Sequence, residues 1–205
     1  MKKIEKDYQE RYGNIPNDNN ERFLYMLNSM RLTPRMKHDI QSQKQNIKKI
    51  KWHSLDFIIY LLPKATPRPR HNGRNNIFYV TGAKENKDIF KSIITKYKNV
   101  NIITTPCKFT CVSYLPIPKS MSNKERILAE LGLIRPISKP DWDNLGKTYS
   151  DMIQGTLLFD DSLIIEGISK KFYSSKPRIE IHIEYMEMHD SFYNEKKMRK
   201  KVDKK

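Results

Sequence analysis

The stretch Lys139–Asp161, KPDWDNLGKTYSDMIQGTLLFDD, gathers five aspartates in one segment of a strongly basic chain. Lys and Arg number 39 against 23 Asp and Glu, so the formal net charge is +16. Carboxylates that converge on one point repel one another and take up protons unless a cation offsets the repulsion. The fold must therefore gather these acids around a cation or use them separately as helix caps, surface ion pairs and turn residues.

The local pattern predicts an extended start followed by a helix. Pro140 biases Lys139 towards extended backbone, and an extended Asp141–Asp143 would project both carboxylates from one side. From Asn144 apolar residues recur at helical spacing, and Gly155 suits the end of the helix. The predicted inward stripe consists of Leu145, Tyr149, Met152 and Ile153.

A second carboxylate pair, Asp160 and Asp161, stands where the next predicted strand begins. A turn there would bring the pair beside the start of the helix, where Asp141 and Asp143 lie. Such a set of oxygens suits Mg²⁺, with Mn²⁺ as a substitute, better than zinc. Lys147 follows Asp143 by one helical turn and would supply positive charge near a bound phosphate.

The charge of the chain indicates a polyanionic partner, with nucleic acid as the first candidate. The segment KATPRPRHNGRNNIFYVTG predicts an irregular, exposed loop, and Arg68, Arg70 and Arg74 on it are candidate phosphate contacts. Lys139 is a weaker candidate. No apolar run is long enough to span a bilayer, and the N-terminus lacks a signal-peptide core, so we expect a soluble, cytoplasmic protein without a membrane partner.

The pattern of elements predicts an α+β fold in three parts. Residues 1–55 form a helical extension that either stabilises the rest or binds DNA, 56–187 form the main domain, and 188–205 form a basic tail. Strands are expected at 56–62, at 108–116 with Cys107 and Cys111 on one buried face, and as an antiparallel pair at 162–173 and 178–185. Helices are expected at 84–98 and, within a mobile insert, after the capping box of Ser122 and Glu125.

The segment KPDWDNLGKTYSDMIQGTLLFDD resembles the central signature of the RusA-like Holliday junction resolvases. That signature runs D-x-D-N-L-x-K, then an aspartate on the same helix, then paired aspartates before a strand. The upstream PKATPRPRHNGRNNIFYVTGAKEN is similar to the family's Arg-rich loop. The resemblance implies an α+β homodimer with a mixed or antiparallel sheet, common in phages and prophages, that cuts branched DNA with Mg²⁺ in the cytoplasm of a bacterium or infected host.

By position, the resemblance implies metal-binding aspartates at Asp141, Asp143 and Asp161, with Asp160 beside them, and a catalytic lysine at Lys147. The function it favours is resolution of Holliday junctions by paired nicks that leave 5′-phosphates, in DNA recombination and repair. Two alternatives stay open: a less selective branch or flap nuclease, and a junction-binding protein in which the acids are structural.

Overall fold

The computed structural model describes residues 2–65, 70–72, 76–78, 83–95 and 101–187. The chain forms two compact units, Met1–Ile50 and Lys51–Lys205. Of the three predicted parts, the basic tail 188–205 lies outside the described residues. Among the described residues, no helix combines the length and the apolar character needed to cross a membrane.

The first unit contains three helices: α1 (Lys2–Tyr12), α2 (Asn19–Ser29) and α3 (Pro34–Lys48). The side chain of Asp18 caps α2, and that of Thr33 caps α3. Pro34 occupies the first turn of α3, where its missing N–H costs no hydrogen bond. These caps start the helices that follow the segments GNIPNDNN and LTPR.

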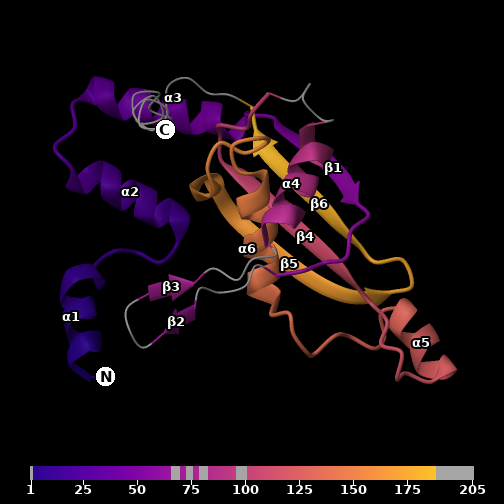
Figure 1. The fold of residues 1–205 in the computed structure, drawn as a ribbon. Coiled ribbons are helices and arrows are strands. Elements are labelled where there is room, and N and C mark those ends of the chain that lie inside the picture. Colours follow the sequence, from indigo (N-terminus) through magenta and orange to yellow (C-terminus); the bar gives the residue numbers. More distant parts are fainter. Residues whose placement is uncertain (1, 66–69, 73–75, 79–82, 96–100, 188–205) are drawn as a thin grey trace. The chain divides into compact units, whose positions relative to one another are not determined.

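The second unit is built on a four-stranded sheet (Figure 1). Its strands are β1 (Trp52–Ile59), β4 (Cys107–Pro116), β5 (Ile164–Ser174) and β6 (Arg178–Met186), in the order β1-β6-β4-β5. β6 is antiparallel to both β1 and β4, whereas β4 and β5 are parallel. The sheet is therefore mixed, and with its helices it confirms the predicted α+β class.

The predicted antiparallel pair at 162–173 and 178–185 is wrong, because β4 lies between β5 and β6 in the sheet. The tenth residue of β4, Pro116, pairs with Ser174 at the end of β5, so both strands end on the same side. Parallel neighbours need a long crossover, which the segment between Pro116 and Ile164 supplies. β6 then returns along the other edge of β4.

Two helices pack on one face of this sheet: α4 (Ala83–Ile94) and α6 (Trp142–Ile153) (Figure 1). The predicted stripe of α6 is confirmed, since Leu145, Tyr149, Met152 and Ile153 are all buried. Alternate residues of β6 are buried in the same cluster, namely Ile179, Ile181 and Ile183. The two cysteines of β4 are buried there too.

The segment predicted as an irregular basic loop contains a short hairpin, β2 (Arg70–Asn72) with β3 (Asn76–Phe78). Its pairing is antiparallel, with His71 opposite Ile77. Arg70 begins β2, while Arg68 and Arg74 lie outside the described residues.

The insert before the acidic segment contains α5 (Asn123–Glu130), which Ser122 and Glu125 start with the predicted capping box. Gly132 has a φ of 72°, a left-handed conformation that glycine adopts without strain, and it follows the end of the helix as predicted. Ala129 of this helix is fully buried against Leu115 and Tyr173 of the sheet, so α5 is packed on the domain, and the mobility of the insert stays a prediction.

Candidate active site

The acidic segment enters α6 earlier than its sequence predicts. Asp141 is the N-cap residue, with extended backbone, and the helix begins at Trp142 rather than at Asn144. Asp143 therefore lies in the first turn instead of continuing an extended strand. The two carboxylates consequently flank the helix N-terminus, where the partial positive charge of the helix favours anions.

Both of these aspartates are exposed. Asp141 holds the capping position, yet its carboxylate makes no capping hydrogen bond. Trp142 between them is 61% exposed, so its indole is not part of the core. The start of α6 therefore presents two exposed carboxylates beside an exposed aromatic ring.

Two side chains of β5 hold this helix start in place. The Oγ of Ser169 donates a hydrogen bond of 2.6 Å to the carbonyl oxygen of Trp142. The Nζ of Lys171 donates to the carbonyl oxygens of Ser138 and Pro140 at 2.8 and 3.0 Å. The backbone on both sides of Asp141 is thus tied to one strand.

Close packing accompanies these hydrogen bonds. A Cβ placed on Gly146 would lie 3.0 Å from the Cβ of Ser169, so glycine lets α6 approach β5 closely. Sequence reasoning did not identify Gly146, Ser169 or Lys171. The available signal was the pair of small residues Gly167 and Ser169, which alternation places on one face of a strand and which indicates a close approach of another backbone.

Lys147 lies one turn further along α6 and is exposed. Its Nζ stands 3.7 Å from an Oδ of Asp151, four residues later on the helix. The helical spacing that brings Lys147 within reach of Asp143 on one side brings it within reach of Asp151 on the other. The ammonium is thereby kept on the exposed side of α6, in the same helix as the candidate metal ligands.

The second carboxylate pair lies in the turn before β5. Asp161 begins a short 3₁₀ helix, η2 (Asp161–Leu163), and is half-buried. Asp160 accepts hydrogen bonds from the backbone N–H of Ser162, at 3.0 Å, and from the hydroxyl of Ser162. Asp160 therefore forms the turn and caps η2, which is the structural role that the sequence left open for it. Asp161 follows as the first residue of η2.

The two carboxylate pairs lie at opposite ends of α6. The helix starts beside Ser169, in the middle of β5, while Asp160 and Asp161 precede the first residue of β5, Ile164. Six strand residues from Ile164 to Ser169 cover about 16 Å at roughly 3.3 Å per residue. Among the described residues, which include all four aspartates, no three acidic, histidine or cysteine side chains are close enough to hold a metal.

The expected convergence of the four aspartates is thus not seen within one chain. The reason is direction: α6 runs opposite to β5, so the turn that follows the helix returns to the beginning of the strand (Figure 1). Asp141 and Asp143 are brought together, and Asp161 is not brought to them. Lys139, a predicted DNA contact, is exposed two residues before Asp141.

Comparison with known proteins identifies the family. The sequence model of the RusA endodeoxyribonucleases matches residues 61–184, which is more than half of the chain and includes the whole acidic segment. The chain belongs to the RusA family. The uncharacterized protein YqaN of Bacillus subtilis (strain 168) is 36% identical over 135 residues, covering 63% of this chain and 94% of YqaN.

RusA-family membership supports the expected nuclease activity: the chain is an endodeoxyribonuclease by family, and the family implies binding of branched DNA. The match starts at residue 61, after the three-helix unit of Met1–Ile50. The family match therefore falls within the second unit, which contains the start of α6.

Proposed function

We propose that this RusA-family chain resolves Holliday junctions by paired nicks that leave 5′-phosphates, using Mg²⁺. The observation that carries the proposal is the carboxylate pair Asp141 and Asp143 at the start of α6, fixed by β5 within a family-matched domain of a chain with a net charge of +16. The hard carboxylate oxygens fit Mg²⁺, and Mn²⁺ would replace it.

A bound divalent ion supplies a Lewis acid at the scissile phosphate and a water of lowered pKa. The residues of the chain do the rest. Asp141 and Asp143 hold the ion at the helix start, and Lys147 offers its exposed ammonium to the charge that develops on the phosphate. Asp151 orients that ammonium through its ion pair.

The third carboxylate is proposed to come from a second copy of the chain. Asp161 is separated from Asp141 and Asp143 by most of the length of α6, about 18 Å for twelve helical residues. In a twofold dimer each chain would contribute its helix start to one site and its Asp161 to the other. Asp160, whose carboxylate accepts from Ser162, would support Asp161 as a further ligand or by shaping the turn.

The edge of the sheet offers a surface for this pairing. β5 is an edge strand of the four-stranded sheet, and Ile165 and Ile168 on it are exposed. Antiparallel pairing of two copies of β5 would direct Asp161 of one chain towards Ser169, and hence the start of α6, in the other. Two such sites related by a twofold axis match the two symmetry-related strands of a four-way junction.

The test is cleavage of a synthetic four-way junction by Asp143→Asn. We expect cleavage with Mg²⁺ to be lost while junction binding in EDTA is retained, because the substitution removes a metal ligand and keeps the shape of the side chain. Asp39→Asn, an exposed acid of the first unit, is the matched control and should cut normally. Undiminished cutting by Asp143→Asn would refute the proposal.

The same assay separates the alternatives. Equal rates on flaps and on four-way junctions, with unpaired nicks, would indicate a less selective branch nuclease. Junction binding without cleavage by the unaltered chain, in Mg²⁺ and in Mn²⁺, would indicate a binding protein.

A further inference from the structure

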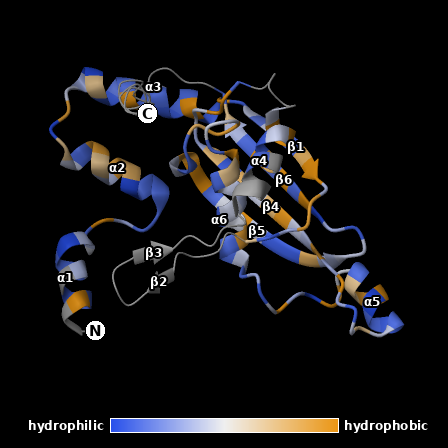
Figure 2. Ribbon diagram, viewed as in Figure 1, coloured by the Kyte–Doolittle hydropathy of each residue, from blue (hydrophilic) through white to orange (hydrophobic). Residues whose placement is uncertain are grey.

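A second surface feature lies directly upstream of the acidic segment. Residues 117–139, which include α5, are here called the α5 arm. Its outward side chains are unusually apolar: Ile127 is 63% exposed, Leu131 67%, Leu133 71% and Ile137 98%. Figure 2 shows hydrophobic stretches among hydrophilic ones on α5 and on the segment that follows it.

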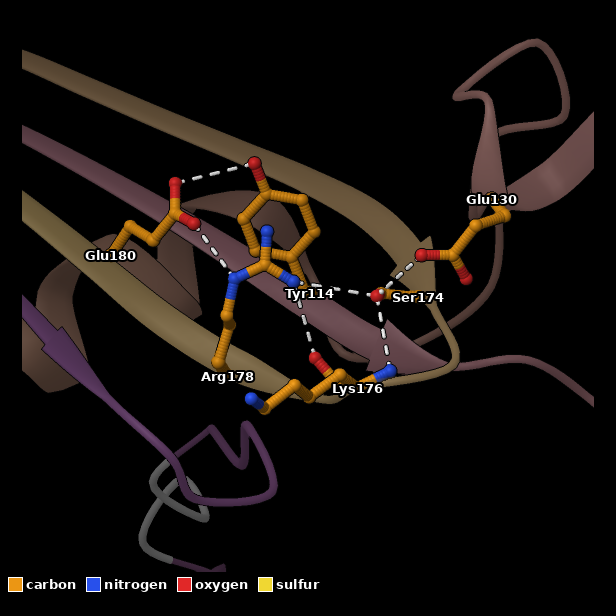
Figure 3. Close-up of polar contacts among 6 residues, drawn as sticks. All are labelled: Tyr114, Glu130, Ser174, Lys176, Arg178 and Glu180. Atoms are coloured by element: carbon orange, nitrogen blue, oxygen red, sulfur yellow. Dashed lines mark hydrogen bonds and ion pairs between the residues drawn. The ribbon is translucent and has the colours of Figure 1, made fainter.

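The α5 arm is attached to the end of the sheet by its acidic residue Glu130. The Oε1 of Glu130 accepts from the hydroxyl of Ser174 at 2.9 Å, and its other oxygen accepts from the backbone N–H of Ser175. Arg178 reinforces this anchor, since its Nη1 donates to the same hydroxyl at 3.3 Å while its Nε pairs with Glu180 at 2.7 Å (Figure 3).

The other end of the arm is attached as well. The guanidinium of Arg135 lies over the ring of Phe172, 3.7 Å from its centre. Lys171 then holds the carbonyl oxygens of Ser138 and Pro140. With Ala129 buried beneath the helix, the exposed apolar side chains stand on a packed element and are not the result of a detached loop.

The acids and the cations of the α5 arm differ in how far they are available to a partner. Its two acids are engaged internally, Glu125 with Ser122 in the capping box and Glu130 with Ser174 and Ser175. Its cations are all exposed, and they are Lys119, Lys124, Arg126, Arg135 and Lys139. The arm therefore presents apolar side chains surrounded by positive charge.

That combination identifies the kind of occupant. A second copy of this same face would bring its own five cations against the basic rim of the arm, so the rim disfavours pairing of two copies here. DNA supplies phosphates for the cations, and isolated aliphatic side chains such as Leu and Ile are known to insert between base steps and unstack them. A branch point has base pairs with a neighbour on one side only, so insertion there costs less unstacking.

We propose that the α5 arm inserts Ile127 and Leu131 at the branch point of DNA, with its cations on the flanking phosphates. The arm ends at Lys139, two residues before Asp141, so a branch point held by the arm places the adjoining strand at the start of α6. This inference rests on the proposed function, for which it supplies the element that selects branched over linear DNA.

The experiment uses the full chain in EDTA, so that DNA is bound and not cut. The probes are a four-way junction with 2-aminopurine at the branch point and a linear duplex of the same arms. The variant is Ile127→Gln with Leu131→Gln, which removes apolar surface and no charge. The matched control is Ile4→Gln with Leu24→Gln, two exposed aliphatic residues on helices of the first unit.

We expect the unaltered chain to raise the 2-aminopurine fluorescence on binding and the double variant to raise it far less. Junction affinity should fall about tenfold, the amount expected when one or two aliphatic side chains lose a buried contact. Affinity for the duplex should not change, and the control should resemble the unaltered chain. If the double variant melts at a lower temperature, the single variant Leu131→Gln provides the same test at a side chain that is 67% exposed.

Two outcomes would overturn the inference alone: a variant that binds and unstacks the junction as the unaltered chain does, or a variant whose only defect is a change from dimer to monomer in sedimentation. The second would make this face a subunit interface. A chain that shows no preference for junctions over duplex would refute the proposed function, and the inference with it. Loss of cleavage in Asp143→Asn has no bearing on the 2-aminopurine signal, so the two failures are distinguishable.

Discussion

The Oγ of Ser169 lies 2.6 Å from the carbonyl oxygen of Trp142, and this hydrogen bond joins the first turn of α6 to the middle of β5. The position of Asp141 and Asp143 is consequently set by the sheet. Because β5 pairs with β4 along its length, the helix start cannot shift without displacing a strand.

Gly146 tests this relationship. We expect Gly146→Val to cost about 1–3 kcal/mol of unfolding free energy, because its Cβ would meet a strand Cβ that cannot retreat. Gly146→Ala should have a smaller effect, since alanine favours the helix. Gly167→Ala is the control, because a Cβ there meets nothing closer than 3.9 Å. The measurements are urea unfolding and junction cleavage.

Cleavage in Gly146→Val should fall more than stability alone explains, since the carboxylates move with the helix start. If the valine variant unfolds and cleaves like the unaltered chain, the close contact of α6 with β5 does not position the site.

The separation of Asp161 from Asp143 predicts complementation between two inactive variants. In a heterodimer of Asp143→Asn and Asp161→Asn, a site shared between chains would combine the intact Asp143 of one copy with the intact Asp161 of the other. One of the two sites would then be complete. We expect co-expressed, doubly tagged heterodimers to nick one strand of the junction, while each homodimer does not cut.

A site contained within one chain gives the opposite result, because each copy in that heterodimer carries one damaged set. Inactive heterodimers, together with active heterodimers of either variant with the unaltered chain, would show that the acids meet within one chain.

Much of the fold follows from local signals in the sequence. The buried stripe of α6, the alternation in β6 and the capping box of Ser122 and Glu125 each depend on residues a few positions apart, and each is confirmed. The pairing of β5 with β4 is different, because it depends on residues about 57 positions apart, as in Cys107 with Ile164. Strand alternation identifies a strand but does not identify its neighbour.

The candidate site likewise has a part that local spacing predicts and a part that depends on long-range packing. Asp141, Asp143 and Lys147 belong to one helix, and their proximity could be predicted from spacing. The place of Asp161 depends on the direction of α6 relative to β5, which spacing does not give. The start of the helix at Trp142 was predicted two residues too late. The position where extended backbone gives way to the first helical turn is uncertain by one or two residues when it is judged from sequence.

The two cysteines predict a loss of stability at alkaline pH. Burial raises the pKa of Cys107 to about 11 and that of Cys111 to about 12, from an ordinary value of 9.0. A thiol whose pKa is higher in the folded state stabilises that state below pH 9 and ceases to do so as the pH rises towards the folded value. The urea midpoint should therefore fall above about pH 9.

Cys111→Ala should flatten that decline, although the smaller side chain lowers stability at every pH. Neither thiol should react with a thiol-specific reagent at neutral pH until the chain is unfolded. Rapid labelling of the folded chain would contradict the burial of β4.

The basic residues of the segment upstream of α4 predict a salt effect. Replacement of Arg68, Arg70 and Arg74 by Ala should weaken junction binding and reduce the slope of log affinity against log salt by about 2–3, since each phosphate contact contributes about 0.9. Replacement of Arg35 and Lys48 of α3 and of its C-cap residue Lys49, all exposed cations, is the charge-matched control. A larger change of slope in the control would show that the main DNA contact is on the three-helix unit.

We expect low pH to release the α5 arm, because protonation of Glu130 weakens its anchor. Hydrogen bonding from the backbone N–H of Ser175 is the main cause that lowers the pKa of this carboxyl from its ordinary value of 4.5. A carboxyl with a lowered folded pKa stabilises the fold above its ordinary value, and that contribution disappears as the pH falls through the folded value. Glu130→Gln should therefore loosen the arm at neutral pH.

Hydrogen exchange of the α5 amides measures this release, after correction for the intrinsic rate at each pH. In Glu130→Gln these amides should exchange several-fold faster at neutral pH, as expected for loss of about 1 kcal/mol from one charged hydrogen bond, while amides of β4 and β6 stay protected. Glu166→Gln, an exposed acid paired with Lys108, is the control and should leave α5 unaffected. Below pH 4.5 the exchange rates of the α5 amides in the unaltered chain should approach those in the variant. Equal protection of α5 in both proteins at neutral pH would instead show that Ala129 and Arg135 alone anchor the arm.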